Sequence, residues 1–226
     1  RAGDPNLHTH SNIINMTQRP DGHWGSLDFT NLWDDSKGRY GEVYSIMLAR
    51  KLTELGYVVK AIGKNAEFEI AGVSDRLINA FSKRRDQIKE AMAERGMEGP
   101  RDAEIANRMT REAKSKLPYQ ELQQKWYQET GHELGSLQAL KEQSRERQRS
   151  GIEVDPVIEA QKALKLSIEH LSQREATFEI KDIISSARSI GIGMLTERAL
   201  QEEYSKLIQS GDLIPGQRDV SRVTTR

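Results

Sequence analysis

The sequence predicts an α+β protein with three regions: strands and helices over residues 1–97, a helical connector over 98–153 and a winged-helix module over 154–226. Three observations support this division. Apolar residues change between strand-like and helical spacing in the first region. The stretches GMEGP (96–100) and SGIEVDPV (150–157) then interrupt the helical pattern. Three helical patterns and a Pro-Gly turn close the chain, which is the order of a winged helix.

The first region contains two predicted β-hairpins with a helix between them. Pro-Asp-Gly at 20–22 supplies the first turn, because proline presets φ and glycine tolerates positive φ. From Tyr40 the apolar residues fall at helical intervals, and Gly56 is expected just past the helix end near Leu55. The segments GYVVKAI and EFEIAG, over residues 56–72, then predict the second hairpin.

The helices that follow are predicted from caps, breaks and apolar spacing. Ser74 is expected to cap one helix that continues through Phe81 to Ile88. Pro118 and Gly131 divide the charged connector, whose composition is typical of a solvated helical linker. The last three helices are predicted from three apolar sets, with Gly211 after the third. The members of these sets are Val157, Ala160, Leu164, Ile168 and Leu171, then Ile180, Ile183, Ile184 and Ala187, then Leu200, Tyr204, Leu207 and Ile208.

Composition limits the classes of function. The chain has 34 Lys and Arg against 34 Asp and Glu, so any nucleic-acid contact must come from local patches rather than from net charge. Cysteine is absent, which excludes disulfides and thiolate metal sites within this sequence. No apolar run is long enough to cross a membrane, so a cytoplasmic protein without membrane insertion is expected. Because Arg1 stands directly before the most distinctive motif, the native polypeptide is expected to extend upstream.

That motif is the histidine pair in DPNLHTH. Side chains alternate along a strand, so His8 and His10 project from the same face and could share one metal ion. Imidazole is a common metal ligand, yet two nearby strand histidines can also simply bond to backbone or carboxylate groups. Both readings stay open on spacing alone. His23, His132 and His170 are expected to be surface imidazoles rather than a third ligand.

The order of motifs resembles the second half of the relaxase domain of MobF-class conjugative relaxases, the TraI and TrwC family. The resemblance rests on DPNLHTH…NMTQRPDGHWGSLD, YGEVYSIMLARKLTELGY and FEIAGVSDRLINAFSKRRDQI, within residues 1 to about 95. It continues more loosely through MTREAKSKLPYQELQQKWYQETG. The segment SIEHLSQREATFEIKDIISSA…LIQSGDLIPG…VTTR is similar to the winged-helix entry to the family's helicase-like region.

The resemblance implies an antiparallel-sheet HUH relaxase domain that nicks and rejoins single-stranded DNA at a plasmid origin of transfer. In this family a tyrosine attacks the phosphodiester, and a divalent metal held by three histidines polarises the phosphate. His8 and His10 match the paired histidines, and Mg, Mn or Zn is the expected metal. The first histidine and the nucleophile are expected upstream, so this chain alone is expected to be inactive. Tyr40 and Tyr44 have helical spacing and are expected to pack.

The resemblance also implies partners. Single-stranded origin-of-transfer DNA, relaxosome accessory proteins and a type IV secretion coupling protein are expected, with ATP used only in a downstream helicase region. The densest basic cluster, Lys83, Arg84 and Arg85, is a candidate for phosphate contact, although a solvated helix face is an equal alternative. Arg111 and Lys114 are similar candidates by resemblance.

The last predicted helix carries Glu197, Glu202 and Glu203 beside Arg198 and Lys206, which favours an architectural role over DNA binding. Two other functions stay open from the sequence. One is a non-catalytic DNA-binding module that uses the helices and wing. The other is a stand-alone metal-dependent hydrolase.

Overall fold

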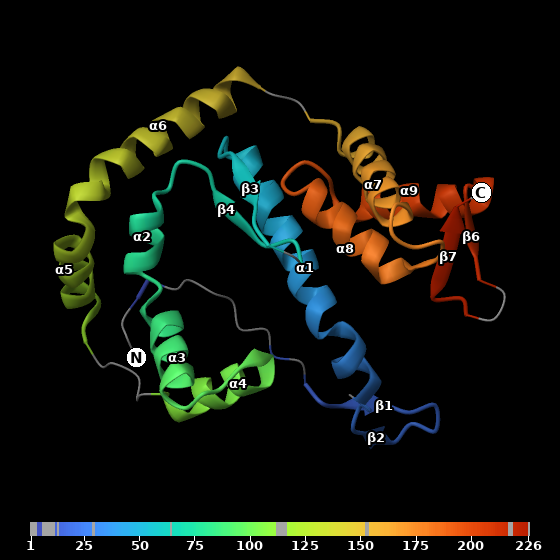
Figure 1. Cartoon of the computed structure of the whole chain (residues 1–226), viewed down its shortest axis with the longest axis horizontal. Coiled ribbons are helices and arrows are strands. Elements are labelled where there is room, and N and C mark those ends of the chain that lie inside the picture. The colour runs from blue at the N-terminus through green and yellow to red at the C-terminus, as the bar shows by residue number, and fades with distance from the viewer. Residues whose placement is uncertain are drawn as a thin grey trace. The chain divides into compact units, whose positions relative to one another are not determined.

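The structure is a computed structural model that describes residues 4–5, 12, 14–28, 30–63, 65–111, 117–151, 154–216 and 219–225, with side chains of the first long helix described from Arg39 onwards. The chain forms two compact units (Figure 1). The smaller unit comprises residues 1–13 and 72–139, and the larger unit comprises residues 14–71 and 140–226. The architecture is α+β, with mostly helices and small antiparallel sheets. Among the described residues, none of the helices has the length and apolar character needed to span a bilayer.

The larger unit opens with the predicted first hairpin. Strands β1 (Thr17–Gln18) and β2 (Trp24–Gly25) pair antiparallel across the Pro-Asp-Gly turn. The turn is closed because the Gly22 amide donates to the Arg19 carbonyl at 2.9 Å, and the Arg19 amide donates to the His23 carbonyl at 2.8 Å. The turn prediction is therefore confirmed.

Helix α1 (Thr30–Glu54) begins ten residues before the predicted start at Tyr40 and ends where predicted. Residues 30–39 carry no apolar helical spacing, which explains why the sequence pattern missed the first turns. Gly56 follows the helix with φ +84°, and a Cβ placed there would lie 1.9 Å from the Ser144 carbonyl oxygen. Glycine is required at this helix end both for its backbone conformation and for the close approach.

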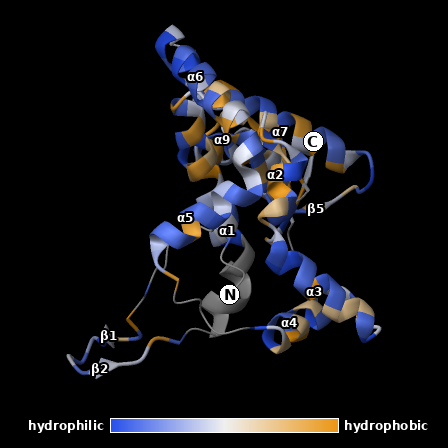
Figure 2. Ribbon diagram, turned by 90° about the vertical axis from the view of Figure 1, so that its left-hand side faces the viewer, coloured by the Kyte–Doolittle hydropathy of each residue, from blue (hydrophilic) through white to orange (hydrophobic). Residues whose placement is uncertain are grey.

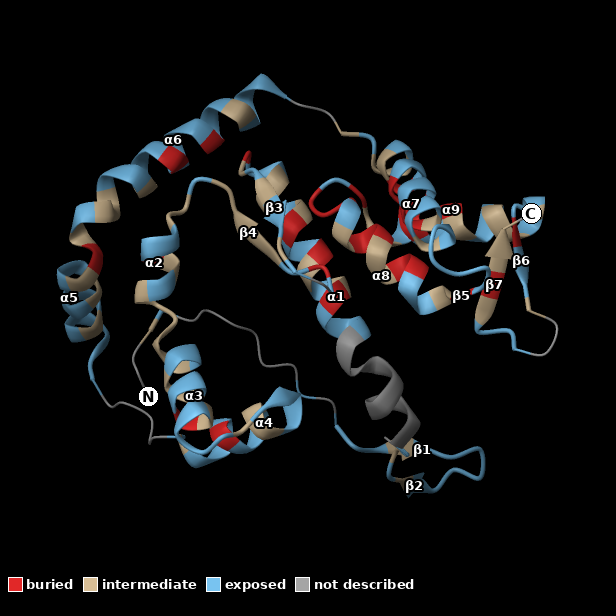
Figure 3. Ribbon diagram, in the orientation of Figure 1, coloured by how far each residue is buried: buried red, intermediate tan, exposed pale blue. Residues whose placement is uncertain are grey.

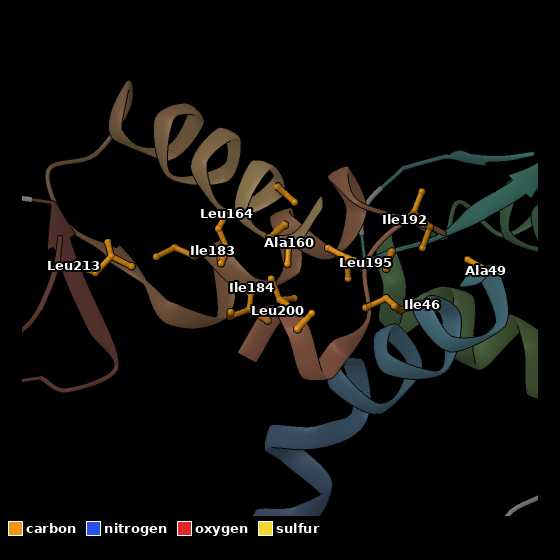
Figure 4. Close-up of a cluster of buried hydrophobic side chains, with 14 of the residues drawn as sticks. Ile46, Ala49, Ala160, Leu164, Ile183, Ile184, Ile192, Leu195, Leu200 and Leu213 are labelled. Carbon is orange, nitrogen blue, oxygen red and sulfur yellow. The ribbon is translucent and has the colours of Figure 1, made fainter. Parts of the chain in front are cut away.

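The buried face of α1 differs from the predicted one. Tyr40 and Tyr44 are 59% and 52% exposed, so the prediction that they pack is wrong for this structure. Among the described side chains of α1, those of Glu42, Ile46 and Ala49 are buried. Ile46 and Ala49 point into a core shared with helices far along the chain (Figure 4). The apolar spacing was correct for a helix, but Glu42, Ile46 and Ala49 rather than the tyrosines occupy the packed face.

The second predicted hairpin is also confirmed. Strands β3 (Val59–Ala61) and β4 (Phe68–Ile70) pair antiparallel, with Lys60 opposite Glu69. The turn between them includes Asn65 and Ala66, which both have positive φ.

The three C-terminal helices and the wing are present in the predicted order. They are α7 (Pro156–Ser172), strand β5 (Phe178–Glu179), α8 (Ile180–Ile190), α9 (Glu197–Ser210), β6 (Leu213–Pro215) and β7 (Arg222–Thr225). The strands form an antiparallel sheet in the order β5-β7-β6. Asp155 caps α7 and Thr196 caps α9 through their side chains, while Gly211 follows the last residue of α9 as predicted.

One hydrophobic cluster holds the larger unit together. It joins α1, the β3–β4 turn, α7, α8, α9 and the wing (Figure 4). The largest fully buried side chains in it are Ile46, Leu164, Phe178, Ile183, Leu195, Leu200, Leu213 and Val223. Helix α6 (Leu134–Ser150), which continues from the smaller into the larger unit, is predominantly hydrophilic (Figure 2).

The smaller unit contains short helices with few buried residues (Figure 3). They are α2 (Asp75–Ala80), α3 (Lys83–Glu94), α4 (Gly99–Met109) and α5 (Tyr119–Thr130), followed by a 3₁₀ turn over Gly131–Glu133. Pro118 and Gly131 flank α5, as the breaks predicted. Ser74 caps α2, but the predicted single helix through Ile88 is wrong, because it is broken at Phe81 and Ser82. There the Ser82 hydroxyl donates to the Ile78 carbonyl at 2.7 Å, a side-chain bond that competes with helix continuation.

Candidate functional site

The proposed metal ligands, His8 and His10, lie outside the described residues. Within the described part of the chain, no group of three or more His, Cys, Asp or Glu side chains could hold a metal ion. The nearest described part of the motif is Asp4, whose Oδ1 lies 3.7 Å from the Nζ of Lys83. That carboxylate oxygen is buried and has no hydrogen-bond partner among the described residues, so Lys83 is its compensating charge.

Lys83 is therefore engaged within the smaller unit rather than free on a surface. Its ammonium group also donates to Glu129 Oε2 at 2.5 Å, which links α3 to α5. Two carboxylates thus share one lysine, and this lysine ties the start of the histidine motif to the helices that follow the second hairpin.

Arg84 closes the C-terminal end of α4. Its guanidinium donates to the Thr110 carbonyl at 2.7 Å, to the Asn107 carbonyl at 2.5 Å and to Asn107 Oδ1 at 2.7 Å. The last carbonyls of a helix have no partner within the helix, and an arginine placed there satisfies them while its charge complements the helix dipole. The Arg84 side chain is consequently committed to packing α3 against α4.

Arg85 and Arg111 have a different environment. Both are exposed, and no hydrogen bond or ion pair engages either guanidinium within the described residues. Arg111 also lines a shallow hollow between α3 and α4 with Glu90, Glu94 and Arg95. The fifth candidate, Lys114, lies outside the described residues. Of the basic triplet, Arg85 alone presents a cation that is not already bonded within the smaller unit.

An aromatic group on α5 was missed by the sequence argument. Tyr119 and Trp126 meet edge to face, with ring centroids 6.1 Å apart, and Tyr119 and Tyr127 are largely exposed. Exposed rings beside cations are the groups on which single-stranded bases stack. The i, i+7 spacing of Tyr119 and Trp126 was the available signal, but in a charged segment it looked like an ordinary helix face.

Helix α9 carries cations that are already paired. Arg198 Nε lies 3.4 Å from Glu202 Oε1, and the Lys206 ammonium group donates to the Glu203 carboxylate. The Glu203 carboxylate also accepts from Gln161 at 2.8 Å. Hydrogen bonds from Lys206 and Gln161 lower the pKa of Glu203. These local pairs leave little uncompensated positive charge on the described face of this helix.

A buried charged group in the larger unit was also missed. Arg188 of α8 is 4% exposed and contacts the carboxylates of Glu42 and Glu197. The signal was present, since Arg188 falls four residues after Ile184 on the apolar face of α8, and Glu42 falls four residues before Ile46 on α1. Opposite charges at apolar helical positions of two segments indicate a buried pair.

Comparisons with known proteins match this chain to conjugation proteins. The TrwC relaxase family model matches residues 1–132. The multifunctional conjugation protein TraI of Escherichia coli is 29% identical over 205 residues, which covers 85% of this chain and 11% of that protein. TraI from strain K12 of the same species is 28% identical over the same length. The chain therefore spans about a tenth of the length of these curated relatives.

Solved relaxases are similar in structure as well as in sequence. The conjugative relaxase TrwC in complex with origin-of-transfer DNA, in its metal-free form, has a TM-score of 0.52 and 34% identity, over 58% of this chain and 47% of that chain. The metal-bound TrwC complex has a TM-score of 0.51 and 36% identity, over 58% and 46%. The family match covers more than half of this chain and includes the histidine motif, so the chain belongs to the TrwC relaxase family.

Proposed function

We propose that this chain is part of a conjugative relaxase that nicks and rejoins single-stranded DNA at an origin of transfer. The observation that carries the proposal is the family match over residues 1–132, which includes the His8-x-His10 motif. Support comes from the TrwC complexes, one of which holds a 27-mer DNA with the recognition hairpin and the cleavage site. The reaction would be a transesterification in which a tyrosine, supplied before the histidine motif, attacks the phosphodiester.

His8 and His10 would hold a divalent metal, with a further ligand from the preceding segment. Two neutral imidazoles suit a borderline cation such as Zn²⁺, whereas Mn²⁺ and Mg²⁺ favour oxygen ligands and remain candidates by the family resemblance. Solved TrwC complexes include metal-bound and copper-bound forms. A bound cation would act as a Lewis acid on the scissile phosphate. The contribution of this chain would be to supply two of the metal ligands, with Lys83 paired to Asp4 at the start of the motif.

The test uses a protein in which the upstream half of a TrwC relaxase is joined before Arg1. His8→Ala and His10→Ala should each lower the rate of oligonucleotide cleavage by at least about 100-fold, the scale on which loss of one charge-stabilising group slows other reactions. The affinity for the same single strand should change much less, because the ion acts on charge that develops in the transition state. His23→Ala, in the exposed turn of the first hairpin, is the matched control. Equal cleavage rates for the His8 variant and the parent at saturating metal would refute the assignment.

DNA contact in the smaller unit would use Arg85 and Arg111, whose side chains are exposed. Each phosphate contact contributes to the salt dependence of binding, so Arg85→Glu should weaken single-strand binding and flatten its salt slope. Lys83 and Arg84, which the sequence grouped with Arg85, would act mainly through the contacts they make inside the unit. Lys114 remains a candidate by resemblance. An unchanged salt slope for Arg85→Glu would mean that this residue contacts no phosphate and lies only on a solvated helix face.

The three C-terminal helices and wing would serve as an architectural element rather than as a DNA reader. The pairing of Arg198 with Glu202 and of Lys206 with Glu203 supports this role. The greater length of TraI supports a continuation into a helicase-like region that uses ATP. Relaxosome accessory proteins and a secretion coupling protein are further partners that the family resemblance suggests.

A further inference from the structure

Helix α1 and the α7–α9 segment, defined as residues 154–225, are held together by a buried ionic group. Arg188 Nη1 donates to Glu42 Oε2 at 2.6 Å, while Nη2 and Nε donate to the two oxygens of Glu197 at 2.6 and 3.1 Å. The hydroxyl of Ser185 donates to the second oxygen of Glu42 at 2.8 Å. One guanidinium thus connects α1, α8 and the first turn of α9, and the carboxylate from α1 is bonded on both oxygens.

Other polar contacts repeat this connection at different points. The amide of Ala66, in the β3–β4 turn, donates to the Ser189 hydroxyl at 3.1 Å. Arg50 of α1 donates to the Met194 carbonyl at 2.6 Å. These bonds join residues more than 120 positions apart in sequence. The β3–β4 hairpin and α1 are therefore both attached to α8 and to the loop after it.

The packing around these bonds is close. Ile46, Ala49 and Ala66 belong to the same buried cluster as Ile192 and Leu195 (Figure 4). Gly193 has φ +76°, and a Cβ there would lie 2.4 Å from Val59 Cγ2 and 2.7 Å from Thr53 Oγ1. The loop that follows α8 can approach α1 and β3 this closely only because it has no side chain at that position.

A buried charge restricts the arrangements that two surfaces can adopt. If α1 moved away, Glu42 would lose its bonds to Arg188 and Ser185, and Arg188 would keep only Glu197. Removing one member of a buried pair is costly, because the remaining charge stays poorly solvated. Burial opposes the charge on Arg188, but hydrogen bonds to Glu197 and Glu42 outweigh this effect and raise its pKa. The ionic group therefore makes the observed contact specific, while the apolar residues supply most of its free energy.

We propose that the α8 face of the α7–α9 segment is an intramolecular docking site for α1 and the β3–β4 hairpin, and that Arg188 is the latch of this site. The element that looks like a separate DNA-binding module in sequence would then serve as a structural partner for the segment that follows the histidine motif. This inference goes beyond the proposed function, because it gives the predicted winged-helix module a structural role toward the segment that precedes the connector.

Hydrogen exchange in the full chain tests the proposal, with variants Arg188→Met, Glu42→Gln and the double variant. Arg188→Met keeps the side-chain volume and leaves Glu42 buried without its cation. Protection of the β3–β4 amides should fall by about 100-fold, whereas the α7 and α9 amides should keep most of their protection. Glu42→Gln should reduce β3–β4 protection by about tenfold. In the double variant the loss should be smaller than the product of the single losses, because the isolated carboxylate is gone.

The matched control is Arg198→Met, which removes an arginine from an exposed pair with Glu202 on α9 and should leave β3–β4 protection unchanged. An equal loss of protection in α7, α9 and β3–β4 after Arg188→Met would overturn the latch, as would unchanged β3–β4 protection. If Arg188→Met does not fold, Glu42→Gln decides: a selective loss in β3–β4 supports docking, and no loss refutes it. The readout needs neither DNA nor metal, so it is independent of the cleavage test.

Discussion

The two units of the chain obtain their order from different interactions. The larger unit shares one apolar cluster among α1, the β3–β4 turn and the three C-terminal helices. In the described part of the smaller unit, the buried residues are only Leu77, Ala91, Ala106 and Thr130. Its helices are held instead by polar contacts, among them Lys83 with Glu129 and Arg84 with the end of α4.

This difference predicts different responses to perturbation. Burial of apolar surface gives most of the free energy of folding, whereas partly exposed polar contacts add about 1 kcal/mol each. The α7–α9 segment of the larger unit should therefore unfold as one cooperative body, and the smaller unit should open at lower free energy. A smaller unit held by local polar contacts can adapt its shape, which suits its proposed contact with DNA. A rigid core in the larger unit suits its proposed architectural role.

The largest effect is expected from a cavity in the larger unit. Leu200 on α9 is fully buried, so Leu200→Ala should lower the free energy of unfolding of that unit by about 3–4 kcal/mol. Leu166→Ala, at a half-exposed position of α7, is the control and should cost less than about 1 kcal/mol. Chemical denaturation followed by circular dichroism measures both. A comparable loss for the two variants would mean that the shared cluster is not the main source of stability.

Removing a polar contact from the smaller unit should lower its free energy of unfolding by less than the cavity lowers that of the larger unit. Arg84→Ala leaves the carbonyls of Asn107 and Thr110 without their charged donor, and we expect a cost of about 1.5–2 kcal/mol. Arg85→Ala, the adjacent exposed position, should leave stability unchanged and should weaken single-strand binding. Hydrogen exchange of α4 and α3 gives the first quantity, and fluorescence anisotropy gives the second. If Arg85→Ala lowered stability and Arg84→Ala weakened only DNA binding, the structural role would belong to Arg85 and the DNA-binding role to Arg84.

Sequence reasoning located the elements better than it located the contacts between them. The structure confirms the features that depend on local chemistry. These are the Pro20–Gly22 turn, the helix end at Gly56, the Ser74 cap and the three C-terminal helices. The packed face of α1 depends on its partners, and no local pattern indicates that Ile46 rather than Tyr44 meets the distant α8. Local patterns report a helix, but its buried side is set by residues that lie far away in sequence.

The candidate site shows the same limit. Lys83, Arg84 and Arg85 are adjacent and chemically alike, so composition alone treats them as one basic patch. On a helix, adjacent side chains point in different directions. Lys83 bonds to Glu129, and Arg84 bonds to the end of α4. The roles of His8 and His10 stay a prediction from motif and family.

Helix caps sharpen the comparison because the local cost should be equal in both units. Ser74 Oγ accepts from the Leu77 amide at 3.1 Å in the smaller unit, and Thr196 Oγ1 accepts from the Ala199 amide at 3.2 Å in the larger. Replacing either residue with alanine should cost about 1 kcal/mol. The Ser74 variant should show faster hydrogen exchange confined to α2 and its neighbours. The Thr196 variant should instead lower the midpoint of the cooperative transition of the larger unit, and local exchange in both variants would remove the distinction between the units.

The smallest expected effect is a pH dependence carried by Glu203 in the larger unit. Hydrogen bonds from Lys206 and Gln161 lower the pKa of this carboxylate below its ordinary value of 4.5. A carboxyl whose pKa is lower in the folded state stabilises the fold above the unfolded pKa, and this contribution is lost as pH falls through the folded pKa. Glu203→Gln should therefore reduce stability slightly at neutral pH and flatten its decline below about pH 4.5. Glu202→Gln removes a charge from the exposed face of the same helix without touching Gln161, and its pH profile should follow the parent. Urea midpoints measured across this pH range provide the test, and parallel profiles for the parent and the Glu203 variant would show that the carboxylate does not contribute.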